Sequence, residues 1–213
     1  NLVQFDNVTI SETAAPLALY RFEEEAGAQT FVDGSGNGHT AGCDAANGQC
    51  PTLGNNGRFH NAAHFSQTSH NLTALSLPFR SSSMTIAAWG KRDSPSSNGG
   101  VLAKLDQEGG LNQNFQLGVS DGGIVYCAHN FGLLFASGTA NTDWHHYACV
   151  LDHEAEELRL YEDGVRMNVQ IYDDPLSGTA ALSIASNNDF EGTIDDVAVF
   201  DAALTVDEIA NLM

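Results

Sequence analysis

The chain has 213 residues, of which 42% are hydrophobic and 16% charged, so it can bury a core and is unlike a disordered polymer in composition. Eight Lys and Arg residues stand against 27 Asp and Glu residues, which gives a formal net charge of −19. Such an acidic surface argues against binding to nucleic acid, and it suits cations, neutral ligands or basic partners. No apolar run is long enough to span a bilayer, so direct membrane insertion is not expected.

The first predicted strand covers residues 17–22, and the glycine-rich stretch FVDGSGNGHTAGCD follows it. From Asp33 onward this stretch approaches the spacing of oxygen ligands and glycine in a twelve-residue EF-hand loop. The flanking residues do not predict the two helices that an EF-hand needs, and position twelve is Asp44 rather than Glu. We therefore interpret the loop as half of a different calcium site. The alternative is that Asp33 and Asn37 make only Asx-turns.

Calcium binds six to eight oxygen atoms, and these often include backbone carbonyls. Asp33 and Asn37 offer side-chain oxygens, while Gly36 and Gly38 allow the positive φ angles that turn carbonyls inward. Because such a loop rarely supplies a complete coordination shell, a carboxylate from a distant part of the chain is expected to complete the site.

The four cysteines are Cys43, Cys50, Cys127 and Cys149, and their even number predicts disulfides in an oxidising compartment. Three pairings are open. We favour Cys43 with Cys50, which closes a short loop, and Cys127 with Cys149, which joins two predicted strands.

Most of the remaining chain consists of short runs rich in β-branched and aromatic residues. These predict strands at 83–91, 115–119, 123–128, 145–151, 157–162, 165–171 and 194–200. Asp-Gly pairs at 121–122 and 163–164 are typical of hairpin turns. One short helix is predicted from Thr205, because Glu208 three residues later makes a capping box. The pattern predicts an all-β sandwich of two antiparallel sheets, a jelly roll, with a short C-terminal helix.

Several stretches also occur in a familiar order: LALYRFEEEAG, DGSGNGHTAG, NAAHFSQ, SMTIAAWGK, VLAK, TDWHHYACVLD, LRLYEDGV and EGTIDDVAVFDAALTVDEIANL. Together they resemble the laminin-G-like jelly-roll domains of the concanavalin A-like lectin/glucanase superfamily. The resemblance implies one such domain at residues 17–213, with residues 1–16 as an N-terminal strand or extension. It also implies two sheets of six or seven strands and an extracellular module, secreted or at the cell surface.

In laminin-G-like relatives the partner of the calcium loop comes from the last strand, which corresponds here to GTIDDVAVF. Asp195 and Asp196 would point to opposite faces of a regular strand, so only one of them could serve, and the resemblance selects Asp195. The resulting set of metal ligands is Asp33, Asn37, Asp195, Gly36 and Gly38, with calcium as the cofactor.

No catalytic residue is predicted, since the E-x-D-x-x-E spacing of related glycoside hydrolases does not occur. Glycan sites combine aromatic rings with amides or carboxylates, and the two strands around the turn at 121–122 offer such groups on one face. The expected ligand-binding residues are Asn114, Gln116, Tyr126, His129, Asn130 and Phe131. An ordinary exposed sheet face is the alternative. Trp89 and Trp144 are expected in the core.

The leading functional hypothesis is an extracellular, calcium-containing lectin-like module that binds a glycan or glycoprotein ligand. The alternative is a non-catalytic protein-interaction or structural module, attached to other domains of a larger adhesin or surface protein and active in cell adhesion. A polysaccharide-degrading enzyme is the third hypothesis.

Overall fold

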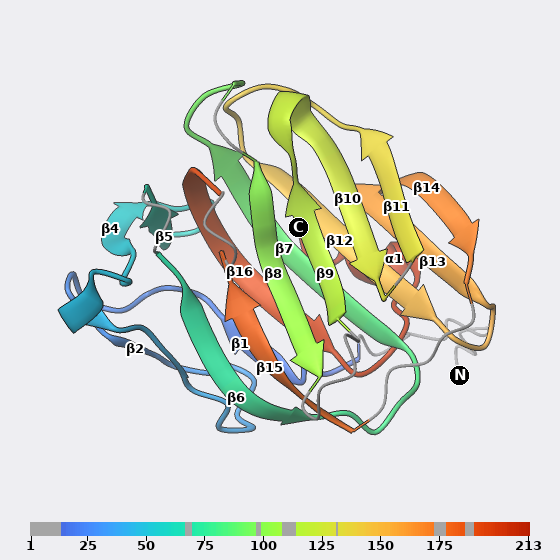
Figure 1. Cartoon of the computed structure of the whole chain (residues 1–213), viewed down its shortest axis with the longest axis horizontal. Coiled ribbons are helices and arrows are strands. Elements are labelled where there is room, and N and C mark those ends of the chain that lie inside the picture. The colour runs from blue at the N-terminus through green and yellow to red at the C-terminus, as the bar shows by residue number, and fades with distance from the viewer. Residues whose placement is uncertain are drawn as a thin grey trace, which may run out of the picture.

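The computed structural model describes residues 14–66, 70–96, 99–107, 114–130, 132–172, 178–185 and 190–213. Within these residues the chain forms two antiparallel sheets, packed face to face, and one short C-terminal helix (Figure 1). This arrangement confirms the predicted two-sheet jelly-roll sandwich. Each sheet has eight strands, slightly more than the family resemblance implies.

The first sheet consists of β1 (Ala18–Tyr20), β4 (Thr52–Asn56), β5 (Asn61–Phe65), β7 (Met84–Arg92), β12 (His145–Asp152), β13 (Glu157–Glu162), β14 (Val165–Ile171) and β16 (Gly192–Phe200). The order across the sheet is β14-β13-β12-β7-β16-β5-β4, and β1 also pairs with β16. Along one edge of β16, β5 pairs with residues 192–194 and β1 pairs with residues 197–199. The last strand therefore changes partner halfway along its length.

The second sheet consists of β2 (Thr30–Phe31), β3 (Ala41–Gly42), β6 (Leu72–Pro78), β8 (Gly100–Gln107), β9 (Asn114–Val119), β10 (Ile124–His129), β11 (Gly132–Ser137) and β15 (Thr179–Ile184). Its order is β11-β10-β9-β8-β15-β6-β3-β2. Two single-turn 3₁₀ helices, η1 (Ala45–Asn47) and η2 (Asp121–Gly123), lie in connections between strands.

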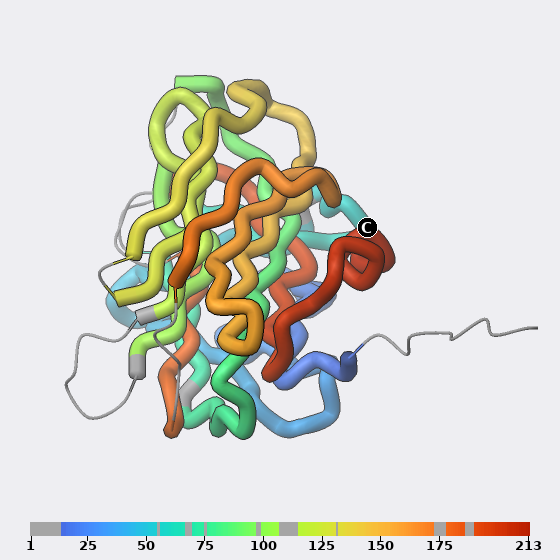
Figure 2. Tube along the Cα trace, turned by 90° about the vertical axis from the view of Figure 1, so that its right-hand side faces the viewer, coloured from blue at the N-terminus to red at the C-terminus, as the bar shows by residue number. Residues whose placement is uncertain are grey.

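Alternating residues of the facing strands fill the space between the sheets. In β7, for example, Ile86 and Ala88 belong to the central core, whereas Ala87 belongs to a second apolar cluster on the outer face of the first sheet. The C-terminal helix α1 (Val206–Ala210) packs on this outer cluster through Ile209 (Figure 2). The outer face of the first sheet is therefore partly covered rather than bare.

The helix begins with the predicted capping box. The Thr205 hydroxyl accepts a bond from the Glu208 N–H, and the Glu208 carboxylate accepts one from the Thr205 N–H at 2.8 Å. Among the described residues, no helix is long and apolar enough to cross a membrane.

Both disulfides have the favoured pairing. Cys43–Cys50 closes the short loop after β3. Cys127 of β10 and Cys149 of β12 join the two sheets through the central core. The two disulfides thus close one loop and cross-link the two sheets.

Candidate functional site

The Asp33 carboxylate organises the glycine-rich loop between β2 and β3. It is buried and accepts backbone N–H bonds from Leu19, Ser35 and His39 at 3.0, 2.9 and 2.9 Å. Burial alone would raise the pKa of Asp33, but a hydrogen bond from the Ser35 side chain, together with these backbone bonds, outweighs it and holds the pKa below its usual value. The flanking elements are strands, which confirms that the loop is not an EF-hand.

The other residues of the loop bind the segment that leads into β1. Gly36 and Gly38 have φ angles of +84° and +83°, as the sequence predicts. The Asn37 side-chain amide donates to the carbonyls of Pro16 and Leu17 at 3.2 and 3.0 Å. The loop therefore holds the segment before β1 against the sandwich through hydrogen bonds.

Asp195 contacts a different part of the chain. Its carboxylate accepts backbone N–H bonds from Arg58, Phe59 and Asp196 at 2.9, 3.2 and 2.9 Å. None of these donors belongs to the Asp33 network, and no described cluster of three or more His, Cys, Asp or Glu residues is arranged to hold a metal. The two carboxylates therefore hold different backbone segments, and calcium binding stays a prediction.

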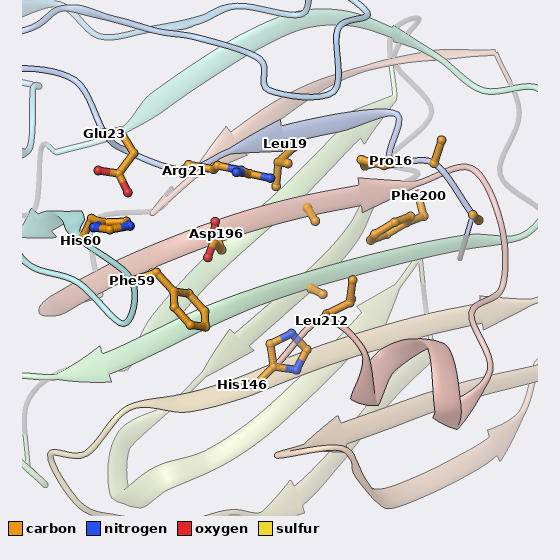
Figure 3. Close-up of a pocket in the computed structure, with 14 residues that line it drawn as sticks. Pro16, Leu19, Arg21, Glu23, Phe59, His60, His146, Asp196, Phe200 and Leu212 are labelled. Atoms are coloured by element: carbon orange, nitrogen blue, oxygen red, sulfur yellow. The ribbon is translucent and has the colours of Figure 1, made fainter. Parts of the chain in front are cut away.

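A cavity of about 530 Å³ opens on the outer face of the first sheet, where β16 changes partner (Figure 3). A β-bulge lies there between Asp195 and Ala198, and Asp196 has a φ angle of +44°. Because the bulge interrupts the alternation of β16, Asp196 lines the cavity while Asp195 holds the adjacent loop. The expectation that these two side chains lie on opposite faces does not hold.

One end of the cavity is polar. Arg21, Glu23, His60 and Asp196 line it, and Figure 3 shows Glu23 and His60 at the same end. The Glu23 carboxylate accepts the Asn61 N–H at 3.3 Å. Burial raises the pKa of Asp196, Arg21 lowers it and Glu23 raises it further. This end can accept and donate hydrogen bonds and has more carboxylates than guanidinium groups.

The rest of the lining is largely apolar, and Figure 3 shows Pro16 and Phe200 at the end away from Glu23 and His60. Leu19, Ala87, Ala198 and Leu212 also line the cavity. Ala87 and Ala198 are direct partners across β7 and β16. Their small side chains leave depth between the polar end and the end of helix α1.

His146 lies at the base of the cavity and is only 2% exposed. Its ring packs edge-on against Trp89, with the ring centroids 5.3 Å apart. Burial lowers the pKa of His146 to about 4, against the opposing effect of Asp163, so the imidazole is neutral at pH 7. Its Nδ1 atom is buried without a hydrogen-bond partner in the described structure. Leaving such an atom unsatisfied costs about 1–3 kcal/mol.

An aromatic wall stands beside His146. Phe59 is 40% exposed and packs edge-on against Trp89, with 6.3 Å between the ring centroids. The Arg58 guanidinium lies 4.9 Å from the Phe59 ring centroid and 4.7 Å from that of Trp89. Asp195 fixes this wall through its bonds to the Arg58 and Phe59 N–H groups. Trp89 therefore lies on the outer face of the sheet rather than in the core between the sheets.

The residues predicted to bind glycans lie on the other sheet. Gln116 and Tyr126 are on the outward face of β9 and β10, and Asn130 follows at the turn after β10. A Cβ atom on Gly118 would lie 2.3 Å from the Tyr126 ring, so only glycine leaves room for that ring above the strand. Phe135, the partner of Tyr126 on β11, is 58% exposed. A glycan-binding role for this face stays a prediction.

His129 does not reach that face. Its side chain is fully buried, and its ring packs against Phe115 and Tyr172 at centroid distances of 6.0 and 5.4 Å. It is a core histidine, and no glycan can contact it without unfolding. Phe131 and the side chain of Asn114 lie outside the described residues.

Comparisons with known proteins agree with this architecture. Residues 65–210 match a family model described as the concanavalin A-like lectin/glucanases superfamily. This region includes the strands from β6 to β16 and helix α1. A comparison with the curated proteins gave no match.

Solved structures with the same fold include domain 4 of a GH43 extracellular arabinanase from Geobacillus stearothermophilus in complex with arabinotriose. It is 16% identical, with a TM-score of 0.70 over 94% of this chain and 99% of that one. The botulinum neurotoxin serotype D ligand-binding domain in complex with N-acetylneuraminic acid is 12% identical, with a TM-score of 0.70 over 93% of this chain. The match spans only 50% of that neurotoxin domain. At these identities the likeness shows the fold alone.

Proposed function

The chain belongs to the concanavalin A-like lectin/glucanase superfamily, as a laminin-G-like domain, and on that premise we propose that it is an extracellular carbohydrate-binding module. The observation that carries the proposal is the cavity on the outer face of the first sheet. There, an aromatic wall and an apolar floor meet carboxylates, a guanidinium and an unsatisfied buried imidazole. Two fold relatives are described in complex with arabinotriose and with N-acetylneuraminic acid, which supports the class of ligand.

The cavity matches the chemistry of a sugar. A pyranose or furanose ring presents C–H groups on its faces and hydroxyls at its edge, so it needs an apolar surface beside directional hydrogen-bonding groups. Phe59 offers the apolar surface. Glu23 and Asp196 can accept hydrogen bonds from sugar hydroxyls, and Arg21 can donate them.

The two disulfides support the extracellular part of the proposal. Disulfides persist in secreted and cell-surface proteins, because the cytosol keeps thiols reduced. Both pairs are closed in this fold, and one of them spans the core.

The proposal is tested by a glycan array, followed by titration calorimetry on the best binder. Asp196→Asn removes a charged acceptor but suits the positive φ at that position, since Asn and Asp both adopt it. Phe59→Ala removes the apolar wall. We expect Asp196→Asn to weaken binding by about tenfold or more, because a hydrogen bond to a charged group contributes about 1.5–3 kcal/mol. Phe59→Ala should weaken binding as well, because the face of the sugar loses its apolar contact.

Glu154→Gln is the matched control, since it removes one carboxylate charge from an exposed turn between β12 and β13. It should bind as the wild type does. The proposal is contradicted if the folded wild-type protein binds no glycan on the array, or if neither cavity variant alters the binding.

Protein interaction is the second candidate function, and a specific surface favours it. Exposed apolar side chains lie on the neighbouring edge strands β11 and β14: Leu133 (56%), Phe135 (58%), Val165 (63%), Val169 (40%) and Ile171 (83%). The Asn168 side chain of β14 donates to the Phe135 carbonyl of β11 at 2.8 Å, which ties the two edges together. Self-association that Ile171→Lys abolishes in sedimentation experiments would support this function.

A further inference from the structure

The two ends of the cavity differ in chemistry, and this difference bears on which sugar fits. Arg21, Glu23, His60 and Asp196 line one end (Figure 3). Pro16 and Phe200 lie at the other end, and Leu19, Leu212, Ala87 and Ala198 add further apolar lining. Its volume of about 530 Å³ lies within the range of small-ligand sites and suits a monosaccharide or a short oligosaccharide.

The apolar end favours a methyl group over a hydroxymethyl group. A hydroxyl placed between Pro16 and Phe200 would leave water without finding a side-chain hydrogen-bond partner among the described lining residues at that end. A methyl group in the same place has no hydrogen bond to lose. Its burial away from water increases the affinity by about fourfold. The end nearest helix α1 therefore selects a sugar with an apolar substituent.

The polar end disfavours an acidic sugar. Glu23 and Asp196 are two carboxylates against the single guanidinium of Arg21 among the described lining residues. His146 adds no positive charge at pH 7, because burial keeps it neutral. The whole chain carries a formal net charge of −19, so an approaching anion is repelled as well.

We propose that this cavity binds neutral sugars that carry a methyl group, as a 6-deoxyhexose or an N-acetylhexosamine does. The sugar hydroxyls bond to Glu23, Asp196 and Arg21, and the methyl group packs against Leu19 and Phe200. This inference rests on the proposed carbohydrate-binding function and names the ligand class of the same site.

The test uses matched pairs of methyl glycosides in ¹H–¹⁵N chemical-shift titrations of the full chain. The pairs are L-fucose with L-galactose, L-rhamnose with L-mannose, and N-acetylglucosamine with glucose. In the first two pairs a methyl group replaces a hydroxymethyl group, and in the third an acetamide replaces a hydroxyl. We expect the methyl-bearing member of at least one pair to bind about fourfold more tightly or better. The pair that responds separates a deoxy sugar from an acetylated one.

Two variants separate the ends of the cavity. Ala198→Leu narrows the cavity beside its apolar end and should abolish the preference within the pair. Ala87→Val adds less volume and replaces it if the leucine variant fails to fold. Asp196→Asn should weaken both members of the pair by a similar factor.

A cavity that binds the hydroxymethyl or hydroxyl member equally well or better in every pair would overturn this inference and leave carbohydrate binding intact. Tighter binding of N-acetylneuraminic acid, which has a methyl group but also a carboxylate, would overturn the requirement for a neutral sugar. If no sugar causes chemical-shift changes and the glycan array also shows no binding, the proposed carbohydrate-binding function itself is wrong.

Discussion

Asp33 illustrates how a single carboxylate can organise the backbone of a loop. It satisfies three backbone N–H groups from two separate segments, and it is 6% exposed. A buried donor left without a partner costs about 1–3 kcal/mol. The glycine-rich spacing that suggested calcium therefore also suits a loop organised by one aspartate.

Asp33→Ala should lower the free energy of unfolding by about 3 kcal/mol or more, measured by urea denaturation. The control is Asp44→Ala, which removes only the cap of η1 and should cost about 1 kcal/mol. Repeating both measurements with calcium and with EDTA tests the predicted metal site. If calcium stabilises the wild type but neither Asp33→Ala nor Asp195→Ala, the predicted calcium site is supported.

Asp195 should make stability depend on pH. Burial raises its pKa from 3.8 to about 7, so between these values the folded state keeps a proton that the unfolded state has lost. The contribution of Asp195 to stability therefore falls as the pH rises through this window. His146 acts in the opposite sense, because its pKa is lowered from 6.5 to about 4.

Comparison of the wild type with Asp195→Asn isolates the aspartate. The melting temperature of the wild type minus that of the variant should decrease as the pH rises from 5 to 8. A difference that stays constant across this range would show that Asp195 does not titrate there.

At the scale of elements, runs rich in β-branched and aromatic residues made some strands predictable. Residues 145–151, 157–162 and 194–200 correspond to β12, β13 and β16. Strands β6 and β15 were missed, since β6 ends at Pro78 and β15 is rich in Ala and Ser, which are weak strand formers. Their pairing with neighbours in the second sheet, not local propensity, makes them strands.

The cavity could not be predicted for a related reason. Its residues come from β1, the segment before β5, β7, β12, β16 and the C-terminus, and no sequence spacing relates them. Pairing of both β1 and β5 with β16 brings these segments together. The two consecutive aspartates in an otherwise apolar last strand were the available signal, because buried charge in a strand often marks a bulge or a site.

The two disulfides should differ in their contribution to stability. Cys127–Cys149 spans 22 residues and Cys43–Cys50 spans 7, and chain entropy alone assigns them about 3 and about 2 kcal/mol. Replacement of each pair by alanines, followed by urea denaturation, checks this order. Equal losses for the two pairs would contradict it.

At the scale of the whole molecule, the net charge of −19 sets how partners approach. A neutral sugar is not steered by this field, so its affinity should change less than about twofold between 50 and 500 mM NaCl. A basic protein partner would instead lose affinity steeply as salt screens the attraction. Calorimetry at the two salt concentrations therefore separates carbohydrate binding from binding of a basic partner.

The central claim is that carbohydrate binds on the outer face of the first sheet. Chemical-shift mapping with the best glycan from the array tests it most directly, because it reports the contacted surface without mutation. We predict that the largest shifts fall on the amides of residues 58–61, Glu23, His146 and Asp196. Shifts confined to Gln116, Tyr126 and Phe135 would place the glycan on the second sheet and contradict the account.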